Sequence, residues 1–381
     1  MRDKLLVFGQ PDIRNEDIRE VEDTLKSLWI GTGPKVAKFE AEFKKYVGAQ
    51  HAVAVSSCTA AMHLSLIVGG IGPGDEVITT PLTFAATANV ILHVGAKPVF
   101  VDVDRTTGLI DPSLIERAIT SKTKAIMPVH LYGRPCEMDE IMRIAERRGL
   151  LVIEDAAHAI EAVYRGRKIG TIGDFTCFSF YVNKNITTCE GGMVTTKRTA
   201  WAERLRTLAH HGLSAIAWER VKVASHYEVI EPGYKYNLTD LNASLGLNQL
   251  RRIGESWRRR RDIFRRYNEA FADLPCWTPP DVAPPSIHAY HLYTLVLNTD
   301  KIGKTRDQVR KELLELNIGT GIHYVSLHLH PYYRDTFGFK PDDFPNARWI
   351  SERTLSLPLS SALTDEDVND VIEAVRKVLG G

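Results

Sequence analysis

The feature that most constrains the fold is a series of short apolar segments in the first half of the chain. They read EVITT at 76–80, KPVFVDVD at 97–104, KAIMPVHLYG at 124–133 and LLVIEDAA at 150–157. Helices are expected after the first and third segments, running through Val90 and Arg147. Apolar strands that alternate with helices are typical of a largely parallel sheet covered on both faces. We therefore predict an α/β fold in which ligands bind at the carboxyl ends of the strands.

Further elements are expected on both sides of this series. Before it, the apolar spacing predicts helices over 17–28 and 36–46, a strand over 52–56 and a helix that opens at 57–61. After it come an apolar run at 175–181, a strand at 192–196 whose direction the pattern leaves open, a loop-like stretch at 221–232 and a helix over 241–253, which Thr239 or Asp240 can cap.

A Pro-rich stretch at 274–286 marks a boundary in the second half of the chain. Beyond it, a strand at 288–297, a helix over 305–316 and a final helix over 365–379 predict a smaller α+β unit. We expect a large domain over 1–250, with 1–34 contributing to its cleft. A small domain over 251–381 would begin with a long helix.

Lys184 is the candidate catalytic residue. It follows the apolar run 175–181 and precedes Gly191 and Gly192, which permit a tight turn or a close backbone approach. A lysine that forms a Schiff base must be neutral when it attacks, whereas a free lysine titrates near about 10.4. Such a lysine needs a partly buried site that lowers its pKa. Most lysines are solvated surface charges, so this motif alone does not decide the role.

Small and polar residues follow the strand 52–56 and open the next helix. Free backbone N–H groups and the helix dipole would point to one place there, which suits a phosphate group. Ordinary capping by Ser57 or Thr59 explains the same residues. The glycine patterns of dinucleotide-binding folds and of P-loops are missing from this stretch.

Polar side chains end several of the predicted strands. Asp155 and His158 follow the strand at 150–157, His130 and Tyr132 end the one before it, and Phe84 follows EVITTPLT. A carboxylate at the end of a buried strand is costly unless a cation or a donor meets it. Asp155 could instead cap the segment that follows.

Charge and cysteine content narrow the class of protein. Lys plus Arg (48) nearly balance Asp plus Glu (47), so no global field favours nucleic acid or an acidic membrane surface. The five scattered cysteines show neither disulfide nor metal-ligand spacing, which favours a reducing, cytoplasmic setting without a metal site. No apolar stretch is long enough to span a membrane.

One basic stretch needs its own explanation. Residues 251–266 contain eight arginines, which could indicate nucleic-acid binding. The same residues carry an apolar helical stripe that includes Ile253, Trp257 and Phe264. A long helix with a solvated charged face is therefore the preferred interpretation.

Taken in order, several motifs resemble one known family. SSCTAAMHL, ITTPLTFAATANVI, VFVDVD, IEDAAHAI, FSFYVNKNITTCEGGM, GYKYNLTDLNASLGL, GIHY and SLPLS follow each other as in the DegT/DnrJ/EryC1/StrS family of sugar aminotransferases. The resemblance runs from about Val7 to the end of the chain. It implies the aspartate aminotransferase-like fold type I and the cofactor pyridoxal 5'-phosphate.

The resemblance also implies roles for individual residues. Lys184 would form the Schiff base, and Asp155 would pair with the pyridine nitrogen of the cofactor. His158 would lie near the phenolic oxygen and Phe84 would stack on the ring. The phosphate would be held by Thr59, the Cys58 amide and Ser179, which precedes Lys184 by the family's spacing of five positions.

A homodimer with shared active sites is a further implication. Asn237 resembles the residue that reaches the partner's cofactor phosphate. Many members of the family read GYNYR where this chain reads GYKYN, so Lys235 is the alternative for that contact. Residues resembling those that line the sugar-nucleotide cleft are Trp29, Gly31, Thr32, His323, Tyr324 and His328. The histidines could equally be packed in a strand or a turn.

The implied reaction moves an amino group from glutamate to a nucleotide-linked keto-sugar. A UDP- or dTDP-4-keto sugar is expected, in the biosynthesis of cell-surface polysaccharide, lipopolysaccharide or amino sugars. The family also contains dehydratases with histidine at the lysine position, so Lys184 favours transamination. The alternatives are amination at another sugar position, a dehydratase of the same fold, amino-acid chemistry without a sugar, and a regulatory, DNA-binding role.

Overall fold

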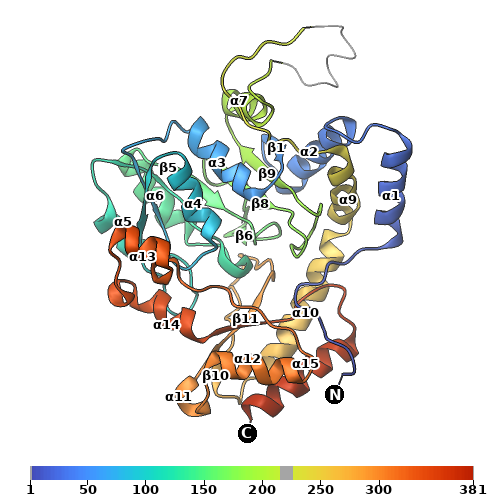
Figure 1. The fold of residues 1–381 in the computed structure, drawn as a ribbon, viewed down its shortest axis with the longest axis vertical. Coiled ribbons are helices and arrows are strands. Elements are labelled where there is room, and N and C mark those ends of the chain that lie inside the picture. The colour runs from blue at the N-terminus through green and yellow to red at the C-terminus, as the bar shows by residue number, and fades with distance from the viewer. Residues whose placement is uncertain (1, 215–225, 381) are drawn as a thin grey trace.

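The computed structural model describes residues 2–214 and 226–380, so residues 221–225 of the predicted loop lie outside the described residues. A seven-stranded sheet lies in the larger part of the chain, with the strand order β1-β9-β8-β5-β4-β2-β3 (Figure 1). Its strands are β1 (His51–Val55), β2 (Glu76–Thr79), β3 (Lys97–Phe100), β4 (Thr123–Ile126), β5 (Leu151–Asp155), β8 (Phe175–Ser179) and β9 (Gly192–Thr196). The predicted α/β class is confirmed.

Strand direction follows the expectation with one exception. Adjacent strands from β8 through β5, β4 and β2 to β3 pair in parallel, whereas β9 is antiparallel to both β1 and β8. This settles the direction of 192–196. Several strands are shorter than the predicted runs: β3 ends at Phe100, β4 ends at Ile126, and β11, in the smaller unit, covers only Tyr293–Leu297. Beyond β4 an isolated parallel bridge continues the pairing, between Val129 and Asp155.

Helices cover both faces of this sheet because successive strand residues point in opposite directions. Val77 packs in one core and its neighbour Ile78 in the other. The first core includes α3 (Cys58–Val68), α4 (Ala85–His93) and α7 (Thr199–Ala209). The second includes α2 (Pro34–Val47), α5 (Pro112–Ala118), α6 (Met138–Arg148) and α9 (Asp240–Arg251).

The caps of two helices resolve choices that the sequence left open. Thr239 accepts a hydrogen bond from the Asn242 amide at the start of α9. Asp240 instead accepts from the Lys35 and Val36 amides in the first turn of α2. One side chain therefore caps α9, and the next ties α9 to a helix that is distant in sequence.

A smaller unit packs around a third core (Figure 1). It holds the long helix α10 (Ile253–Ala270) and a three-stranded sheet of β10 (Cys276–Trp277), β11 (Tyr293–Leu297) and β12 (Thr354–Leu357). Leu6 belongs to this core although it lies near the N-terminus. Its helices are α11 (Thr299–Ile302), α12 (Arg306–Glu315) and α15 (Asp365–Leu379). The helices α13 (Pro331–Phe337) and α14 (Pro345–Arg353) instead pack on the second core through Tyr333, Ala347 and Ile350. The remaining elements are α1 (Asn15–Lys26) and the hairpin of β6 (Val163–Tyr164) and β7 (Arg167–Lys168).

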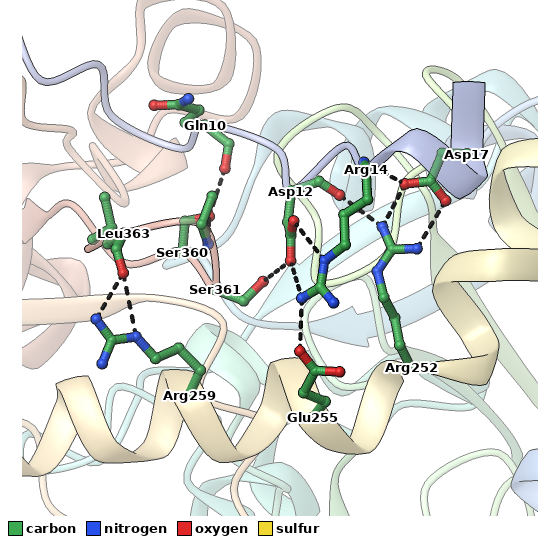
Figure 2. Close-up of polar contacts among 11 residues, drawn as sticks. Gln10, Asp12, Arg14, Asp17, Arg252, Glu255, Arg259, Ser360, Ser361 and Leu363 are labelled. Carbon is green, nitrogen blue, oxygen red and sulfur yellow. Dashed lines mark hydrogen bonds and ion pairs between the residues drawn. The ribbon is translucent and has the colours of Figure 1, made fainter. Parts of the chain in front are cut away.

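The arginines of α10 do not form a uniformly solvated face, which corrects the expectation. Figure 2 shows Arg252 and Glu255 holding the segment that contains Asp12, Arg14 and Asp17. Arg260 is buried and donates to the Leu359 carbonyl across 3.0 Å. These cations face internal partners because α10 packs between the N-terminal segment and the C-terminal unit. Within the described ranges, no helix is long and apolar enough to cross a membrane.

Candidate active site

A cavity of about 520 Å³ contains Lys184. Strand ends, the start of α3 and the segment 323–324 form its walls. Nine of the residues predicted for the site line it together: Cys58, Thr59, Phe84, Asp155, His158, Ser179, Lys184, His323 and Tyr324. The geometry gathers these side chains from five separate stretches of sequence, while their chemical roles stay predictions.

Lys184 is held on a loop that leaves β8 and returns to β9. The loop is closed at its base, where the Phe180 amide donates to the Gly191 carbonyl across 2.9 Å. Burial lowers the pKa of Lys184 to about 8, although the nearby Cys58 thiol and Asp155 carboxylate act in the opposite direction. Among the described residues, none forms a hydrogen bond or ion pair with its Nζ atom. About a tenth of this amine is thus neutral at pH 7, and about half is neutral at pH 8.

Asp155 ends β5 and has two hydrogen-bond donors. The Thr87 hydroxyl donates to Oδ2 across 2.8 Å, and the Ala157 amide donates to Oδ1 across 3.1 Å. Burial raises the pKa of Asp155, whereas these two donors and the charge of Lys184 oppose the rise. The Ala157 contact is the local turn that the sequence offered as an alternative. Thr87 directs the carboxylate from a second element, α4.

The start of α3 presents free donors to the cavity. Ser57 caps the helix by accepting from the Ala60 amide across 3.0 Å. Among the described residues, no group accepts from the Cys58 or Thr59 amides. Capping and anion binding are therefore compatible here. Gly192 is needed beside this turn, because a Cβ on it would lie 2.5 Å from the Ser57 carbonyl oxygen.

His158 is held as a neutral ring. Its Nδ1 accepts from the Tyr132 amide across 3.2 Å, so its proton lies on Nε2, which is 3.3 Å from the Tyr324 hydroxyl. Burial and the charge of Lys184 lower the pKa of His158 well below its ordinary value. His158 can therefore donate from Nε2 into the cavity.

A buried polar row lies behind this wall. The His158 ring packs on His291 with centroids 4.3 Å apart, and His291 Nδ1 lies 2.9 Å from Asn185 Oδ1. Asn185 also donates to Glu161 across 2.8 Å. Because Asn185 follows Lys184 directly, this row anchors the backbone that carries the amine.

Several predicted residues lie outside the cavity. Asn237 donates to the Thr32 hydroxyl across 2.6 Å, and both line a different cavity. The Trp29 indole donates to the Thr32 carbonyl, and Gly31 accepts from the Asp240 amide. Lys235 is exposed. This chain therefore does not bring 29–32 or 235–237 to its own Lys184.

His328 is also elsewhere, in a packed turn. It is buried, its Nδ1 lies 2.9 Å from the Ser326 hydroxyl, and its Nε2 lies 3.1 Å from the Pro341 carbonyl. His323 differs, because it lines the cavity while its Nδ1 meets the Ser356 hydroxyl at 2.7 Å. His328 therefore matches the alternative of a histidine packed in a turn, whereas His323 lies at the cavity.

Sequence reasoning missed four residues at or behind the site. They are Thr87, Asn183, Asn185 and His291. Thr87 follows Phe84 by three positions, which places both in the first turn of one helix and is a usable signal. Asn183 and Asn185 flank Lys184 directly. Nothing local marks His291, which reaches the site from the C-terminal half of the chain.

The residues of this cavity fit pyridoxal 5'-phosphate. Free amides at the start of α3 and the Ser179 hydroxyl suit the phosphate, and Asp155 suits a protonated ring nitrogen. Phe84 is 62% exposed at the cavity wall, where an aromatic ring could stack on it. In addition, the buried Asn183 Oδ1 has no hydrogen-bond partner among the described residues, so the cavity wall still offers an acceptor.

Comparison with known proteins agrees with the fit of the cavity to pyridoxal 5'-phosphate. The profile of the DegT/DnrJ/EryC1/StrS aminotransferase family matches residues 11–376. The uncharacterized protein MJ1066 of Methanocaldococcus jannaschii is 52% identical over 381 residues, covering 100% of this chain and 99% of that protein. The spore coat polysaccharide biosynthesis protein SpsC of Bacillus subtilis is 51% identical, covering 100% and 98%. The PLP form of Spr1654 from Streptococcus pneumoniae has a TM-score of 0.90 at 35% identity, covering 98% and 100%.

Proposed function

The chain belongs to the DegT/DnrJ/EryC1/StrS aminotransferase family, whose cofactor is pyridoxal 5'-phosphate, and on that premise we propose that it aminates a nucleotide-linked keto-sugar. The donor is an amino acid, glutamate, and the acceptor is a UDP- or dTDP-4-keto sugar. One observation carries the proposal: a lysine of lowered pKa, a donor-held carboxylate and a helix start with free amides line one cavity. The similarity to a polysaccharide biosynthesis protein supports a sugar as the acceptor.

The chain's own residues divide the work of binding. The Cys58 amide, Thr59 and Ser179 hold the phosphate of the cofactor, and Asp155 pairs with the ring nitrogen. Phe84 would pack on the ring, and the Nε2 proton of His158 would be available to its phenolic oxygen. When bound, the cofactor supplies a carbonyl that takes up the amino group and a ring that accepts electron density.

Lys184 performs the proton transfers. Its neutral Nζ accepts the proton from Cα of the amino-acid donor, and the resulting ammonium returns a proton to the carbon that receives it. The same group then runs the steps in reverse on the sugar carbon that gains the amine. A lowered pKa serves both directions, because near pH 8 the neutral amine and the ammonium are both populated.

We also propose that the enzyme is a homodimer that shares its active sites. Asn237 and Thr32 lie outside the chain's own Lys184 cavity, and the buried Asn237 Oδ1 has no partner among the described residues. Leu28, next to this loop, is 88% exposed, which is costly for a large apolar side chain in an isolated subunit. A second subunit would cover Leu28 and receive Asn237.

The reaction is tested by turnover. Purified enzyme is incubated with glutamate and UDP- or dTDP-4-keto sugars, with ordinary 2-oxo acids in parallel, and the amino product is measured. Lys184→Ala should lose about 10³-fold or more in rate, while Lys44→Ala on the exposed face of α2 should retain activity. Turnover of 2-oxo acids alone would contradict the sugar acceptor. Full activity of Lys184→Ala would contradict the role of the lysine.

Site sharing is tested by mixing two inactive variants. Lys184→Ala and Asn237→Ala subunits are unfolded together, refolded and assayed. Random pairing leaves one intact site in each mixed dimer, so activity should return to about a quarter of the native level. No recovery, with a dimer confirmed by light scattering, would show that Asn237 does not serve the partner's site.

A further inference from the structure

A second cavity, of about 390 Å³, lies apart from Lys184. Its walls come from the loop 105–108, from the strands β10 and β11, and from α14. Its volume falls within the range of about 300–1,000 Å³ that is typical of small-molecule sites. The reaction assigned to Lys184 makes no use of this cavity.

Two tryptophans form a corner in this cavity. The rings of Trp277 and Trp349 have centroids 5.1 Å apart and planes inclined by 62°. Trp277 is 50% exposed, so much of its indole can receive a ligand. A nucleobase stacks best between parallel rings, whereas this corner offers one open indole beside a second ring that is steeply inclined to it. The apolar C–H face of a pyranose fits such an indole.

The cavity also holds a cation that has no anionic partner among the residues described by the structure. The Arg105 guanidinium carbon lies 3.8 Å from the centroid of the Trp349 ring, which fixes its position. Among the described residues, Arg105 forms no hydrogen bond or ion pair. The adjacent carboxylate, Asp104, accepts instead from the Thr106 and Thr107 amides. A phosphate or a carboxylate on the ligand would supply the missing anion.

Hydroxyl groups complete the lining. Thr278 and Thr294 both line the cavity, and their side chains form no hydrogen bond with any residue that the structure describes. Each hydroxyl can both donate and accept, which matches the hydroxyl groups of a sugar.

We propose that this cavity binds a pyranose that carries an anionic group, either a phosphate or a carboxylate. The ring packs on Trp277, the anion meets Arg105, and the sugar hydroxyls meet Thr278 and Thr294. The site is separate from the Lys184 cavity, so it can be tested whether or not the proposed sugar acceptor is correct.

Isothermal titration calorimetry of the cofactor-loaded enzyme tests the site. The probes are glucose 6-phosphate, glucuronate, glucose, inorganic phosphate and UMP. The two anionic sugars should bind with Kd values of about 1 mM or lower, about tenfold tighter than glucose, because Arg105 adds a charge-assisted contact. Whichever of glucose 6-phosphate and glucuronate binds more tightly shows whether the site prefers a phosphate or a carboxylate.

Variants distinguish this cavity from the one around Lys184. Arg105→Gln should reduce the affinity for the anionic sugars to that for glucose, and Trp277→Ala should abolish the binding of all three sugars. Phe84→Ala, at the other cavity, should leave these affinities unchanged. Arg105 and Trp277 are exposed, so circular dichroism spectra of both variants should match the native spectrum.

Several results would overturn the proposal. They are the absence of binding up to about 10 mM, inorganic phosphate or UMP binding as tightly as the sugar phosphate, and sugar binding that survives in both variants. Loss of binding in Phe84→Ala alone would assign the ligand to the Lys184 cavity.

Discussion

The hydroxyl of Thr87 donates a hydrogen bond to Asp155 across 2.8 Å, although the two residues lie 68 positions apart. Thr87 sits in the first turn of α4, and Asp155 ends β5. The same hydroxyl is 2.8 Å from Thr83, so a short chain of hydroxyl groups supports one carboxylate oxygen. This pair sets the direction of the group assigned to the cofactor ring and opposes the rise in its pKa that burial causes.

Removing this donor should weaken cofactor binding. Thr87→Val keeps the shape of the side chain but leaves Asp155 with one donor fewer, so its pKa should rise further. We expect cofactor affinity to fall about fivefold to tenfold, the value of about one hydrogen bond. Equilibrium dialysis of the cofactor-free protein measures the effect. Thr87→Ser should restore the native affinity, and equal affinities for all three proteins would refute the role of Thr87.

The lowered pKa of Lys184 predicts a pH profile for cofactor capture. The pKa is about 8 in the folded protein, so the rate of covalent capture should rise about tenfold per pH unit and level off above about pH 8. Stopped-flow absorbance after mixing cofactor-free protein with pyridoxal 5'-phosphate measures this rate. N-acetyl-lysine methyl amide is the control, and its rate should keep rising towards pH 10. A protein profile that also rises to pH 10 would contradict the lowered pKa.

The same shift has a consequence for stability. Between about pH 8 and 10.4 the folded chain has released the Lys184 proton, while the unfolded chain still holds it. The contribution of Lys184 to the free energy of unfolding therefore increases as the pH rises through this window. Lys184→Met should lose that part of the pH dependence in urea unfolding of the cofactor-free protein.

Asn185 should matter for both stability and rate. Asn185→Ala leaves Glu161 Oε2 and His291 Nδ1 without their buried partner, which should cost about 1–3 kcal/mol of unfolding free energy. The rate of the proton transfers assigned to the neighbouring Lys184 should also fall. Thermal unfolding and single-turnover kinetics measure the two effects, with the exposed Asn369→Ala as control. If Asn185→Ala is as stable as the native protein, the buried polar row around Asn185 does not contribute to stability as predicted.

The contact between α1 and Arg252, which joins α9 to α10, should also contribute strongly to stability. Arg252 donates to the fully buried Asp17 across 2.8 Å (Figure 2). Arg252→Met leaves that buried carboxylate without its cationic partner. We therefore expect the free energy of unfolding, measured in urea, to fall by about 3–5 kcal/mol. Arg251→Met, at the preceding position, should cost less than about 0.5 kcal/mol, because Arg251 is exposed. If both variants cost the same, the Asp17 contact is not the cause.

The local pattern of residues was sufficient for most elements, and together with the resemblance of the motifs to a known family it indicated residues that line the Lys184 cavity. Apolar periodicity placed most strands and helices, because burial on one or both faces repeats at the spacing of the element itself. Lys184, Asp155 and the start of α3 are candidates because each lies at or after the end of a strand, among polar or small residues. These signals lie within a few positions of one another.

Only the tertiary structure decided what meets across the chain. It made β9 antiparallel, buried Arg260, put Thr87 on Asp155 and His291 behind His158, and placed Asn237 outside the Lys184 cavity. None of these follows from periodicity, because a side chain's partner depends on strand order, register and helix packing between distant segments. The sequence by itself therefore determined the parts and the reactive groups. The fold determined their partners, and with them the charge and direction of each group.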